Sequence, residues 1–378
     1  MFPFLYPNYN HSVLNISNSV LAHYRAPIQY ATLPVLDKEL SKTPKNVILW
    51  ILDGMGMNVL EKSLPKNAFL RKHLTDTITS VFPPTTATAT TTFYSALPPI
   101  VHGWAGWSPY FKQADKCIEL FTGRDTYTKE KTDIEPTKTL PYPHLFTQIE
   151  QADKTITCTR IFPQKVCPDG ARYFCHQCHR ILKQSRQAGR QFILAYWPDP
   201  DHTCHHQGTY TTPTKKKMKA INAQIEELCN QLTDSLVIIS ADHGHIPIND
   251  FFYIDKHPDF EACFKTPLTL DDRVSAVFLK RGKEQKFLNL FNTYLKDDFF
   301  LIKSMDALEQ GLFGTGKENP FIRDFLGDYL IIGIGHRALR QNIPHCHPTP
   351  EFKSSHAGLS PQEMLVPLIT IRKYTETK

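Results

Sequence analysis

The sequence predicts an α/β fold in which helices flank a mostly parallel sheet, with a small α+β unit inserted late in the chain. Two observations support this prediction: four short apolar runs that look like strands, and amphipathic stretches between them. Continuous hydrophobicity, without alternation, is typical of strands buried on both faces, as in parallel sheets. Strands that alternate with helices indicate an α/β domain. The four apolar runs are residues 46–52, 192–197, 235–240 and 364–371.

The clearest helix is expected over residues 215–232. Its apolar residues recur at helical spacing, which indicates one face packed on the rest of the protein. They are Met218, Ile221, Ile225, Leu228 and Leu232. Three lysines at 215–217 open this stretch, and we interpret them as part of the solvated face.

Residues 251–339 show a different pattern of expected elements. They contain an expected strand at 273–280, a helix near 283–295 and another strand at 327–333. We therefore predict an α/β core made of residues 1–250 and 340–378, with residues 251–339 inserted as a small α+β cap.

The composition indicates a soluble globular protein with a large core. Of 378 residues, 41% are hydrophobic and 21% are charged, and the net charge of +6 is modest for this length. Basic and aromatic residues are not interleaved in the way that nucleic-acid surfaces require, so we expect no nucleic-acid partner. Apolar stretches are too short to cross a bilayer, and the N-terminus does not read as a signal peptide, so we expect no membrane association.

The nine cysteines are odd in number and lack the regular spacing of a disulfide framework. This pattern suits a reducing cytoplasm, where we expect the protein to reside. Cys175, Cys178 and His179 match the haem-attachment string C-x-x-C-H, but they fall inside an expected helix. A metal clip is an alternative, but we interpret them first as ordinary helix residues. The cluster at 345–347, His-Cys-His, stands next to prolines, which indicates a loop.

Polar side chains follow three of the predicted strands. The first strand ends in Asp53-Gly-Met-Gly, the second leads to Asp201-His-Thr-Cys-His205, and the third ends in Asp242-His243-Gly-His. Ligands of open α/β sheets bind outside the carboxyl ends of the strands, so these side chains are expected at one edge of the sheet.

Such a group of carboxylates and imidazoles predicts a metal site. Carboxylates held close together repel each other, and divalent cations remove that repulsion. Mixed Asp and His ligation suits Zn²⁺ best, with Mn²⁺ or iron as alternatives. His356, just before the last strand, is a candidate for a further ligand.

The stretch VFPPTTATATTTFYSALPP, residues 81–99, holds six threonines between two proline pairs. The alternation of Thr and Ala fits a strand, whereas Pro-Pro-Thr fits the start of a helix. The threonines are either small residues packed behind a sheet, or one of them is a nucleophile. A cation and a helix N-terminus both help a threonine hydroxyl to lose its proton.

Taken in order, these motifs resemble the alkaline phosphatase superfamily, in its type I phosphodiesterase/nucleotide pyrophosphatase family. The resemblance rests on five features: the D-G-M-G turn, the P-T-x-A segment that closes with A-L-P-P-x-x-H-G, the D-x-x-x-H-x-x-G motif, D-H-G and the late histidine. These features span roughly residues 46 to 372, nearly the whole chain. The resemblance implies an alkaline-phosphatase-like fold for the catalytic core.

Carried over residue by residue, the resemblance implies two divalent metal ions, most simply Zn²⁺. Asp53, Asp242 and His243 would hold one ion, and Asp201, His205 and His356 would hold the other. Thr86, also a ligand, would be the nucleophile, because its distance from His102-Gly103 matches the spacing in the family. Thr85 remains an alternative.

The resemblance implies a phosphodiesterase or nucleotide pyrophosphatase that forms a phosphothreonine intermediate on a small-molecule phosphate ester, for which a nucleotide is one candidate. These enzymes usually place an asparagine about twenty residues after the nucleophile, but here Trp107 stands near that place. Trp104, Trp107 or Tyr110 therefore either shape a leaving-group pocket or anchor a loop.

Three alternatives remain open from the sequence. The first is a phosphomonoesterase or a phosphonate hydrolase of the same superfamily. The second is a non-catalytic, metal-dependent binding module, against which the intact ligand set argues. The third is a sugar-phosphate mutase, for which residues 251–339 are a short cap. The sequence leaves the oligomeric state open.

Overall fold

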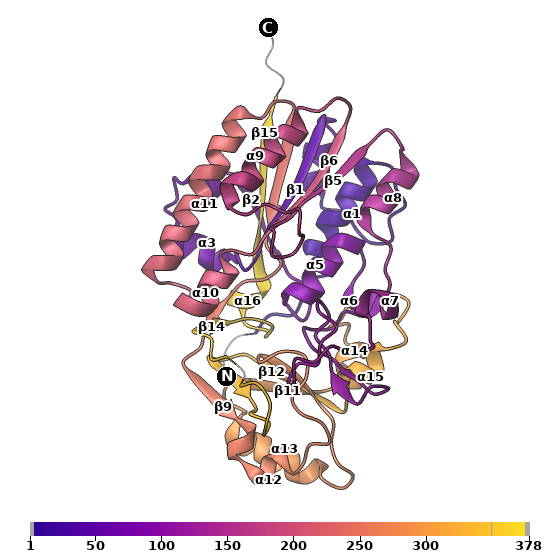
Figure 1. Ribbon diagram of the computed structural model, residues 1–378, viewed down its shortest axis with the longest axis vertical. Coiled ribbons are helices and arrows are strands. Elements are labelled where there is room, and N and C mark those ends of the chain that lie inside the picture. Colours follow the sequence, from indigo (N-terminus) through magenta and orange to yellow (C-terminus); the bar gives the residue numbers. More distant parts are fainter. Residues whose placement is uncertain (1–3, 349, 375–378) are drawn as a thin grey trace.

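The computed structural model describes residues 4–348 and 350–374. Its centre is a six-stranded sheet with the strand order β2-β15-β7-β1-β6-β5 (Figure 1). Four neighbouring strands, β7, β1, β6 and β5, run parallel, whereas β15 runs antiparallel to both of its neighbours. The strands are β1 (Asn46–Leu52), β2 (Leu74–Thr79), β5 (Thr157–Ile161), β6 (Gln191–Trp197), β7 (Ser235–Ser240) and β15 (Leu365–Lys373). The predicted mostly parallel sheet is confirmed.

The last predicted strand is buried but does not run parallel, so this part of the prediction is wrong. In the structure, β15 pairs antiparallel with both β7 and β2. Unbroken hydrophobicity reports burial on both faces, and β15 is buried because it lies between two strands and contacts helices α2 (Pro34–Leu40) and α3 (Met57–Ser63). Strand direction depends on the connections, which the apolar run does not encode.

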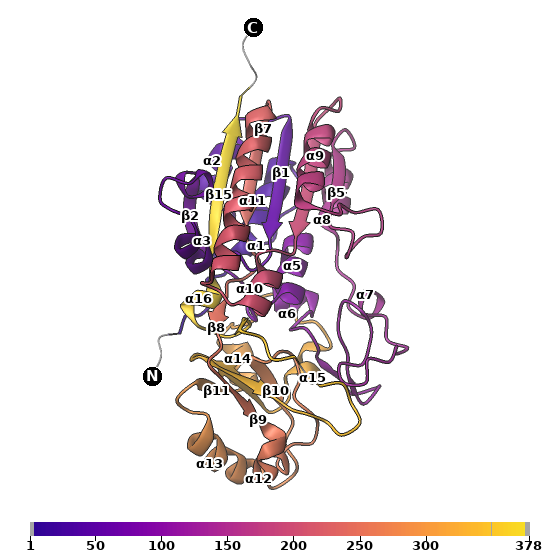
Figure 2. The ribbon, with the colours of Figure 1, turned by 60° about the vertical axis from the view of Figure 1, so that its left-hand side comes forward.

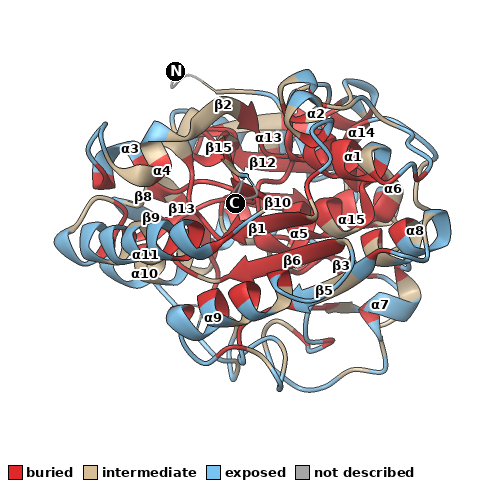
Figure 3. Ribbon diagram, turned by 90° about the horizontal axis from the view of Figure 1, so that it is seen from above, coloured by how far each residue is buried: buried red, intermediate tan, exposed pale blue. Residues whose placement is uncertain are grey.

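Helices cover both faces of this sheet. One group contains α1, α2, α5 and α8, and the other contains α3, α4, α9, α10 and α11. Figure 2 shows α9 and α11 in front of the strands, and Figure 3 shows the buried strands between the two groups. Their bounds are α1 (Val13–His23), α4 (Phe69–Lys72), α5 (Thr86–Ser95), α8 (Leu145–Ala152), α9 (Phe174–Ser185), α10 (Asp201–Gln207) and α11 (Thr212–Gln231).

The predicted amphipathic helix is α11, which begins three residues before the predicted start. Met218, Ile221, Ile225 and Leu228 form its buried side, and the lysines before them leave the opposite side polar. Leu232 follows the end of the helix and is also buried. The haem-like string lies on α9, where Cys178 is buried and Cys175 is exposed.

Below the sheet in Figure 1 lies a second layer of structure that is drawn from residues 250–340. Its three-stranded antiparallel sheet has the order β10-β12-β11. The predicted strands and helix here correspond to β10 (Val274–Val277), β12 (Tyr329–Gly333) and α13 (Glu284–Tyr294), and the sequence did not reveal β11 (Phe299–Lys303). A parallel pair, β9 (Asp250–Tyr253) and β13 (Arg337–Arg340), joins the same layer.

The two layers share a hydrophobic cluster. Phe82 and Ile100 from the first part of the chain pack in one buried group with Ile332 and Met364. The division at residues 251–339 stays a prediction. The shorter elements are β3 (Tyr110–Phe111), β4 (Lys116–Cys117), β8 (Ile246–Pro247), β14 (Ser354–Ser355), α6 (Pro99–His102), α7 (Pro136–Thr139), α12 (Pro258–Glu261), α14 (Ser304–Glu309), α15 (Ile322–Leu326) and α16 (Pro361–Met364), together with a 3-10 turn at Ile254–Lys256.

None of the helices in the described part of the chain has the length and apolarity required to span a membrane.

Candidate metal centre

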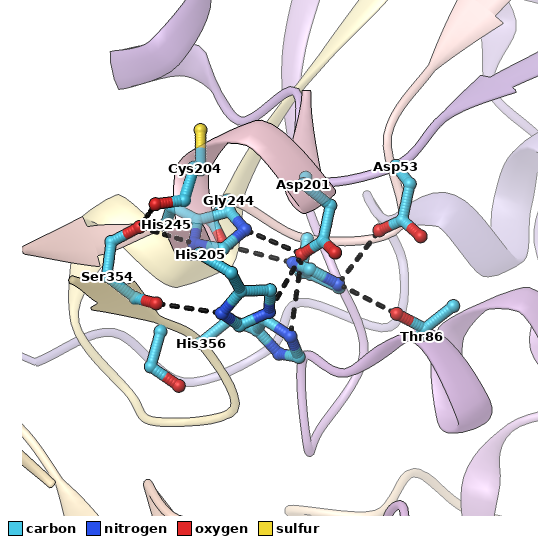
Figure 4. A network of polar contacts seen from close by, with 12 residues as sticks. Asp53, Thr86, Asp201, Cys204, His205, Gly244, His245, Ser354 and His356 are labelled. Carbon is cyan, nitrogen blue, oxygen red and sulfur yellow. Dashed lines mark hydrogen bonds and ion pairs between the residues drawn. The ribbon is translucent and has the colours of Figure 1, made fainter. Parts of the chain in front are cut away.

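The carboxyl ends of three neighbouring strands bring the predicted ligands together. Asp53 directly follows β1, Asp201 opens α10 after β6, and Asp242 follows β7. Figure 4 shows the side chains of Asp53, Thr86 and Asp201 pointing toward one another, with His205 and His356 alongside. All seven predicted site residues lie in this group: Asp53, Thr86, Asp201, His205, Asp242, His243 and His356.

We call Asp53, Asp242 and His243 the inner cluster. Their ligand atoms all lie within 4.8 Å of one another, and all three side chains are buried. Nε2 of His243 lies 3.2 Å from Oδ1 of Asp53 and 3.6 Å from Oδ2 of Asp242. The inner cluster therefore converges on one point.

Each inner carboxylate has one oxygen held by the protein and one left free. The backbone N–H groups of Gly54 and His243 donate to Oδ1 of Asp242, at 3.1 and 3.0 Å. The hydroxyl of Tyr196 donates to Oδ2 of Asp53. The other two oxygens, Oδ1 of Asp53 and Oδ2 of Asp242, are buried without a hydrogen-bond partner. Buried unpaired carboxylate oxygens are costly unless a cation binds them, so the inner cluster fits a divalent metal ion.

His243 is held in the tautomer that a metal ligand needs. Its Nδ1 lies 3.0 Å from the carbonyl oxygen of Gly244, which can only accept, so Nδ1 carries the proton. Nε2 then faces the inner cluster and can bind a metal ion once its own proton is released. This arrangement, with one ring nitrogen donating to a backbone carbonyl, is the usual orientation device of metal-binding histidines.

We call Asp201, His205, His245 and His356 the outer cluster. Oδ1 of Asp201 lies 3.2 Å from Nε2 of His205 and 3.7 Å from Nε2 of His356, and the ligand atoms of Asp201 and His356 also lie within 4.8 Å of that of His243. The closest imidazole is a residue that the sequence analysis did not select: Nε2 of His245 lies 2.7 Å from the same oxygen. In the sequence, the only sign of His245 is that it directly follows the Asp-His-Gly motif.

The side chains of Thr86 and Thr85, at the start of α5, contact different partners. The hydroxyl of Thr86, the first residue of the helix, lies 3.2 Å from Nε2 of His243. The hydroxyl of Thr85 donates to Asp271, at 3.4 Å. Thr90 and Thr91 donate to backbone carbonyls one turn earlier, as expected for helix residues packed in the interior.

The charged groups shift one another's pKa values. Burial, and then the neighbouring carboxylates of Asp242 and Asp201, raise the pKa of Asp53 well above its ordinary value. Burial, and then His243, lower the pKa of His356 well below its ordinary value. Burial opposes the charge on His243, but the carboxylates of Asp242 and Asp53 raise its pKa to about 10. A divalent cation would relieve the repulsion between these carboxylates.

Gly54 allows this close arrangement. Its φ is +69°, and a Cβ atom there would lie 2.8 Å from Cβ of Asp201 and 2.9 Å from Cδ2 of His245. Any larger residue would push the first strand end away from the outer cluster.

A cavity of about 380 Å³ opens beside the outer cluster and Thr86. Its lining combines aromatic and charged side chains that include Trp107, Lys129, Asp271, Arg340 and Phe352. Trp107 lines the cavity, whereas Trp104 and Tyr110 are buried, and the indole N–H of Trp104 donates to a backbone carbonyl. Only Trp107, of the three, is placed to contact a substrate.

Asp271 is a second residue of the cavity that the sequence did not reveal. Its carboxylate accepts hydrogen bonds from the backbone N–H of Trp107, at 3.0 Å, and from Thr85. Burial raises its pKa to about 8. A larger cavity of about 960 Å³ lies at the opposite, amino ends of β1 and β6, away from the proposed site residues.

A family model supports the resemblance seen in the sequence. The model of the type I phosphodiesterase / nucleotide pyrophosphatase family matches residues 148–299. This segment includes Asp201, His205, Asp242 and His243, whereas Thr86 and His356 lie outside it. No curated protein sequence matches the chain.

Solved structures share the fold. Murine ectonucleotide pyrophosphatase / phosphodiesterase 5 has a TM-score of 0.65 at 16% identity, covering 87% of this chain and 90% of that one. An inactive threonine-to-alanine variant of the same protein, in complex with AMP, has a TM-score of 0.64 at 16% identity, with the same coverage of 87% and 90%. Phosphonoacetate hydrolase from Sinorhizobium meliloti 1021, in complex with phosphonoformate, has a TM-score of 0.65 at 15% identity, covering 93% and 94%.

At these identities the structural likeness shows the fold, and the family model adds the sequence pattern of the central motifs. Together they confirm that the chain resembles the type I phosphodiesterases and nucleotide pyrophosphatases.

Proposed function

We propose that the protein is a phosphodiesterase or nucleotide pyrophosphatase that uses Thr86 as its nucleophile and two divalent metal ions, most simply Zn²⁺. The observation that carries this proposal is the position of the Thr86 hydroxyl. It lies 3.2 Å from Nε2 of His243, a residue of the inner cluster, and on the wall of the cavity. A nucleophile, a set of unpaired ligand atoms and a substrate-sized space thus meet at one place.

In this proposal the inner cluster holds one ion and the outer cluster holds the other. When bound, the ions would lower the pKa of the Thr86 hydroxyl and of a water molecule and neutralise charge on the phosphoryl oxygens. The mixture of carboxylates and imidazoles favours Zn²⁺, and Mn²⁺ or iron would accept the same donors.

The protein itself orients the attacking oxygen. Thr86 is the first residue of α5, so the partial positive charge of the helix N-terminus favours an anionic oxygen there. In the proposed reaction the Thr86 oxygen bonds to phosphorus while the bond from phosphorus to the leaving oxygen breaks. The hydroxyl proton passes to water, and the leaving group takes up a proton. A water molecule then cleaves the phosphothreonine, which releases a phosphate monoester and restores Thr86.

The proposed substrate is a small phosphate ester, with a nucleotide as one candidate. A fold neighbour bound to AMP, in a variant that a threonine-to-alanine change makes inactive, supports both the substrate class and the nucleophile. The neighbouring phosphonoacetate hydrolase supports a phosphonate as the second candidate. Trp107, which lines the cavity and stands in the sequence near the place of the family's asparagine, is proposed to contact the leaving group. The cytoplasmic location stays a prediction.

The test measures turnover of bis-(p-nitrophenyl) phosphate and of p-nitrophenyl phosphate by the Zn²⁺-loaded protein. The Thr86→Ala variant is measured in the same way as a control. We expect a preference for the diester and its loss in the variant. A preference for the monoester would assign the protein to the monoesterases instead. If phosphonoacetate were cleaved and both esters were not, the phosphonate hydrolase would replace the first proposal. If two metal ions bound without turnover that depends on Thr86, a binding module would be favoured.

A further inference from the structure

We propose that His245 is a direct ligand of the outer metal ion, held in place by Ser354, so that the outer site has one carboxylate and three imidazoles. This inference rests on the two-metal site of the proposed function and changes the composition of its outer half. The sequence motifs assigned that half only to Asp201, His205 and His356.

Hydrogen bonds to Ser354 fix which nitrogen of each imidazole carries a proton. The Ser354 hydroxyl donates its only proton to the carbonyl oxygen of Cys204, at 2.7 Å. Its oxygen can therefore only accept from Nδ1 of His245, which lies 3.2 Å away. The backbone carbonyl of Ser354 accepts in turn from Nδ1 of His205, at 2.8 Å. Both histidines are thus protonated on Nδ1, which leaves Nε2 as the ring nitrogen that can bind a metal ion.

Both Nε2 atoms lie close to the same carboxylate oxygen. Nε2 of His245 lies 2.7 Å from Oδ1 of Asp201, and Nε2 of His205 lies 3.2 Å from it. In the metal-free protein a proton on Nε2 holds each imidazole against this carboxylate, and a divalent ion bound among the same atoms would take the place of these protons. The donor atoms of these three residues all lie within 4.8 Å of one another, which a single ion can bridge.

The backbone makes this arrangement part of the fold. Ser354 lies on β14, which pairs antiparallel with β8, the strand that begins directly after His245. The ladder places Ser354 beside that strand, where its carbonyl holds one imidazole and its hydroxyl holds the other. Figure 4 shows Ser354 on one side of His205 and His245, with Asp201 on the other. His245 is fully buried, so it is shielded from competing water.

The consequence is an asymmetric pair of sites. The outer site would have four carboxylate and imidazole donors, whereas the inner cluster offers three such donors together with the Thr86 hydroxyl. We therefore expect the outer site to bind its ion more tightly than the inner site.

The experiment measures metal binding rather than turnover. The chelator-treated full-length protein is titrated with Zn²⁺ against a chromophoric chelator, and with Co²⁺ while the visible absorption of the bound ion is recorded. The variants are His245→Gln, Ser354→Ala and, as a matched control, His206→Gln, which changes an exposed histidine of α10 outside both clusters. Circular dichroism of each metal-free protein checks its folding.

We expect two ions per chain in the wild-type protein and in His206→Gln. In His245→Gln the tighter site should weaken at least about 100-fold and the Co²⁺ spectrum should change, because a ligand is lost. In Ser354→Ala the affinity should fall about 10- to 100-fold with the Co²⁺ spectrum retained, because only the orientation is lost.

The outcomes separate the two proposals. Fewer than two ions in the wild-type protein would contradict the two-metal site itself. Two ions in the wild-type protein, with unchanged affinities and an unchanged Co²⁺ spectrum in His245→Gln, would overturn the role of His245 alone. A weaker site with an unchanged spectrum would overturn it as well, since His245 would then only position Asp201. If His245→Gln failed to fold, loss of affinity in Ser354→Ala would support the inference, and unchanged affinity would overturn it.

Discussion

The hydroxyl oxygen of Thr86 lies 3.2 Å from Nε2 of His243, where the side chains that end two strands meet the first turn of α5. The neighbouring hydroxyl, that of Thr85, points to Asp271 instead. Two consecutive residues thus carry a hydroxyl beside the inner cluster and a hydroxyl that joins α5 to the second layer.

The two threonines should therefore respond differently to substitution. We expect Thr86→Ala to lower kcat by at least about 10³-fold, because the attacking oxygen is lost. Thr86→Ser should retain part of the activity, since it retains a hydroxyl. Thr85→Val removes one hydrogen bond to Asp271 and should cost less than about tenfold. The measurement is steady-state turnover of a p-nitrophenyl ester with equal metal loading. A larger loss in Thr85→Val than in Thr86→Ala would transfer the nucleophile to Thr85.

The central strands could be predicted from the sequence because strands that are buried on both faces consist of unbroken apolar runs. β1 and β7 match the predicted runs to the residue, and both are buried along their whole length. The two edge strands were missed: β5 is mostly exposed or half-buried, and most of β2 is half-buried. An edge strand needs fewer apolar residues, so it leaves no continuous run to detect.

The positions of the candidate site residues that directly follow strands or form spaced motifs could also be predicted, because their place in the chain fixes their place at the edge of the sheet. His245 and Asp271 could not. The orientation of His245 depends on Ser354, which is 109 residues away in the sequence. Asp271 enters the cavity from the second layer by pairing with the backbone of Trp107, and a single sequence carries no signal of that contact.

Removal of the metal ions should destabilise the protein, because the free oxygens of Asp53 and Asp242 then face each other without a counter-ion. An ion present at 100 times its Kd adds about 2.7 kcal/mol to the free energy of unfolding for each site. Asp242→Asn removes one charge while it retains an acceptor for the two backbone N–H groups. We therefore expect this variant to be more stable than the wild type with chelator, and to gain less from Zn²⁺.

The measurement is thermal unfolding with chelator and with graded Zn²⁺. Glu309→Gln, a change to an exposed carboxylate outside both clusters, should leave both melting temperatures unchanged. Equal gains from Zn²⁺ in Asp242→Asn and in the wild type would exclude Asp242 as a ligand.

Asp271 should make stability depend on pH. Burial raises its pKa from 3.8 to about 8, so the folded state keeps a proton that the unfolded state has already lost. Between these two pH values the folded state binds more protons, and its stability must fall as the pH rises, by at most about 1.4 kcal/mol per pH unit. Asp271→Asn removes this titration. Urea unfolding at pH 5, 6.5 and 8 should show the variant gaining on the wild type as the pH rises, and a constant difference would contradict the assignment.

Glu363 ties the loop that carries His356 to the second layer. Its carboxylate pairs with Arg273 through two hydrogen bonds, of 3.0 and 2.7 Å, and both side chains are fully buried. The same carboxylate accepts from the backbone N–H of Gly358, at 2.7 Å, and from the hydroxyl of Ser360, at 2.6 Å. The loop that follows His356 is therefore held by one buried charge.

Glu363→Gln should consequently change both stability and metal binding. Because it leaves Arg273 buried without its counter-charge, we expect the free energy of unfolding to fall by about 3–5 kcal/mol. The loop after His356 loses its anchor, so the affinity of the outer site should fall about tenfold or more. Glu318→Gln is the matched control, since it breaks an exposed pair with Arg323 and should cost less than about 1 kcal/mol. The measurements are urea unfolding and Zn²⁺ competition on both variants. If Glu363→Gln lost stability but retained its metal affinity, the buried pair would serve only to join the layers. The position of His356 would then have another origin.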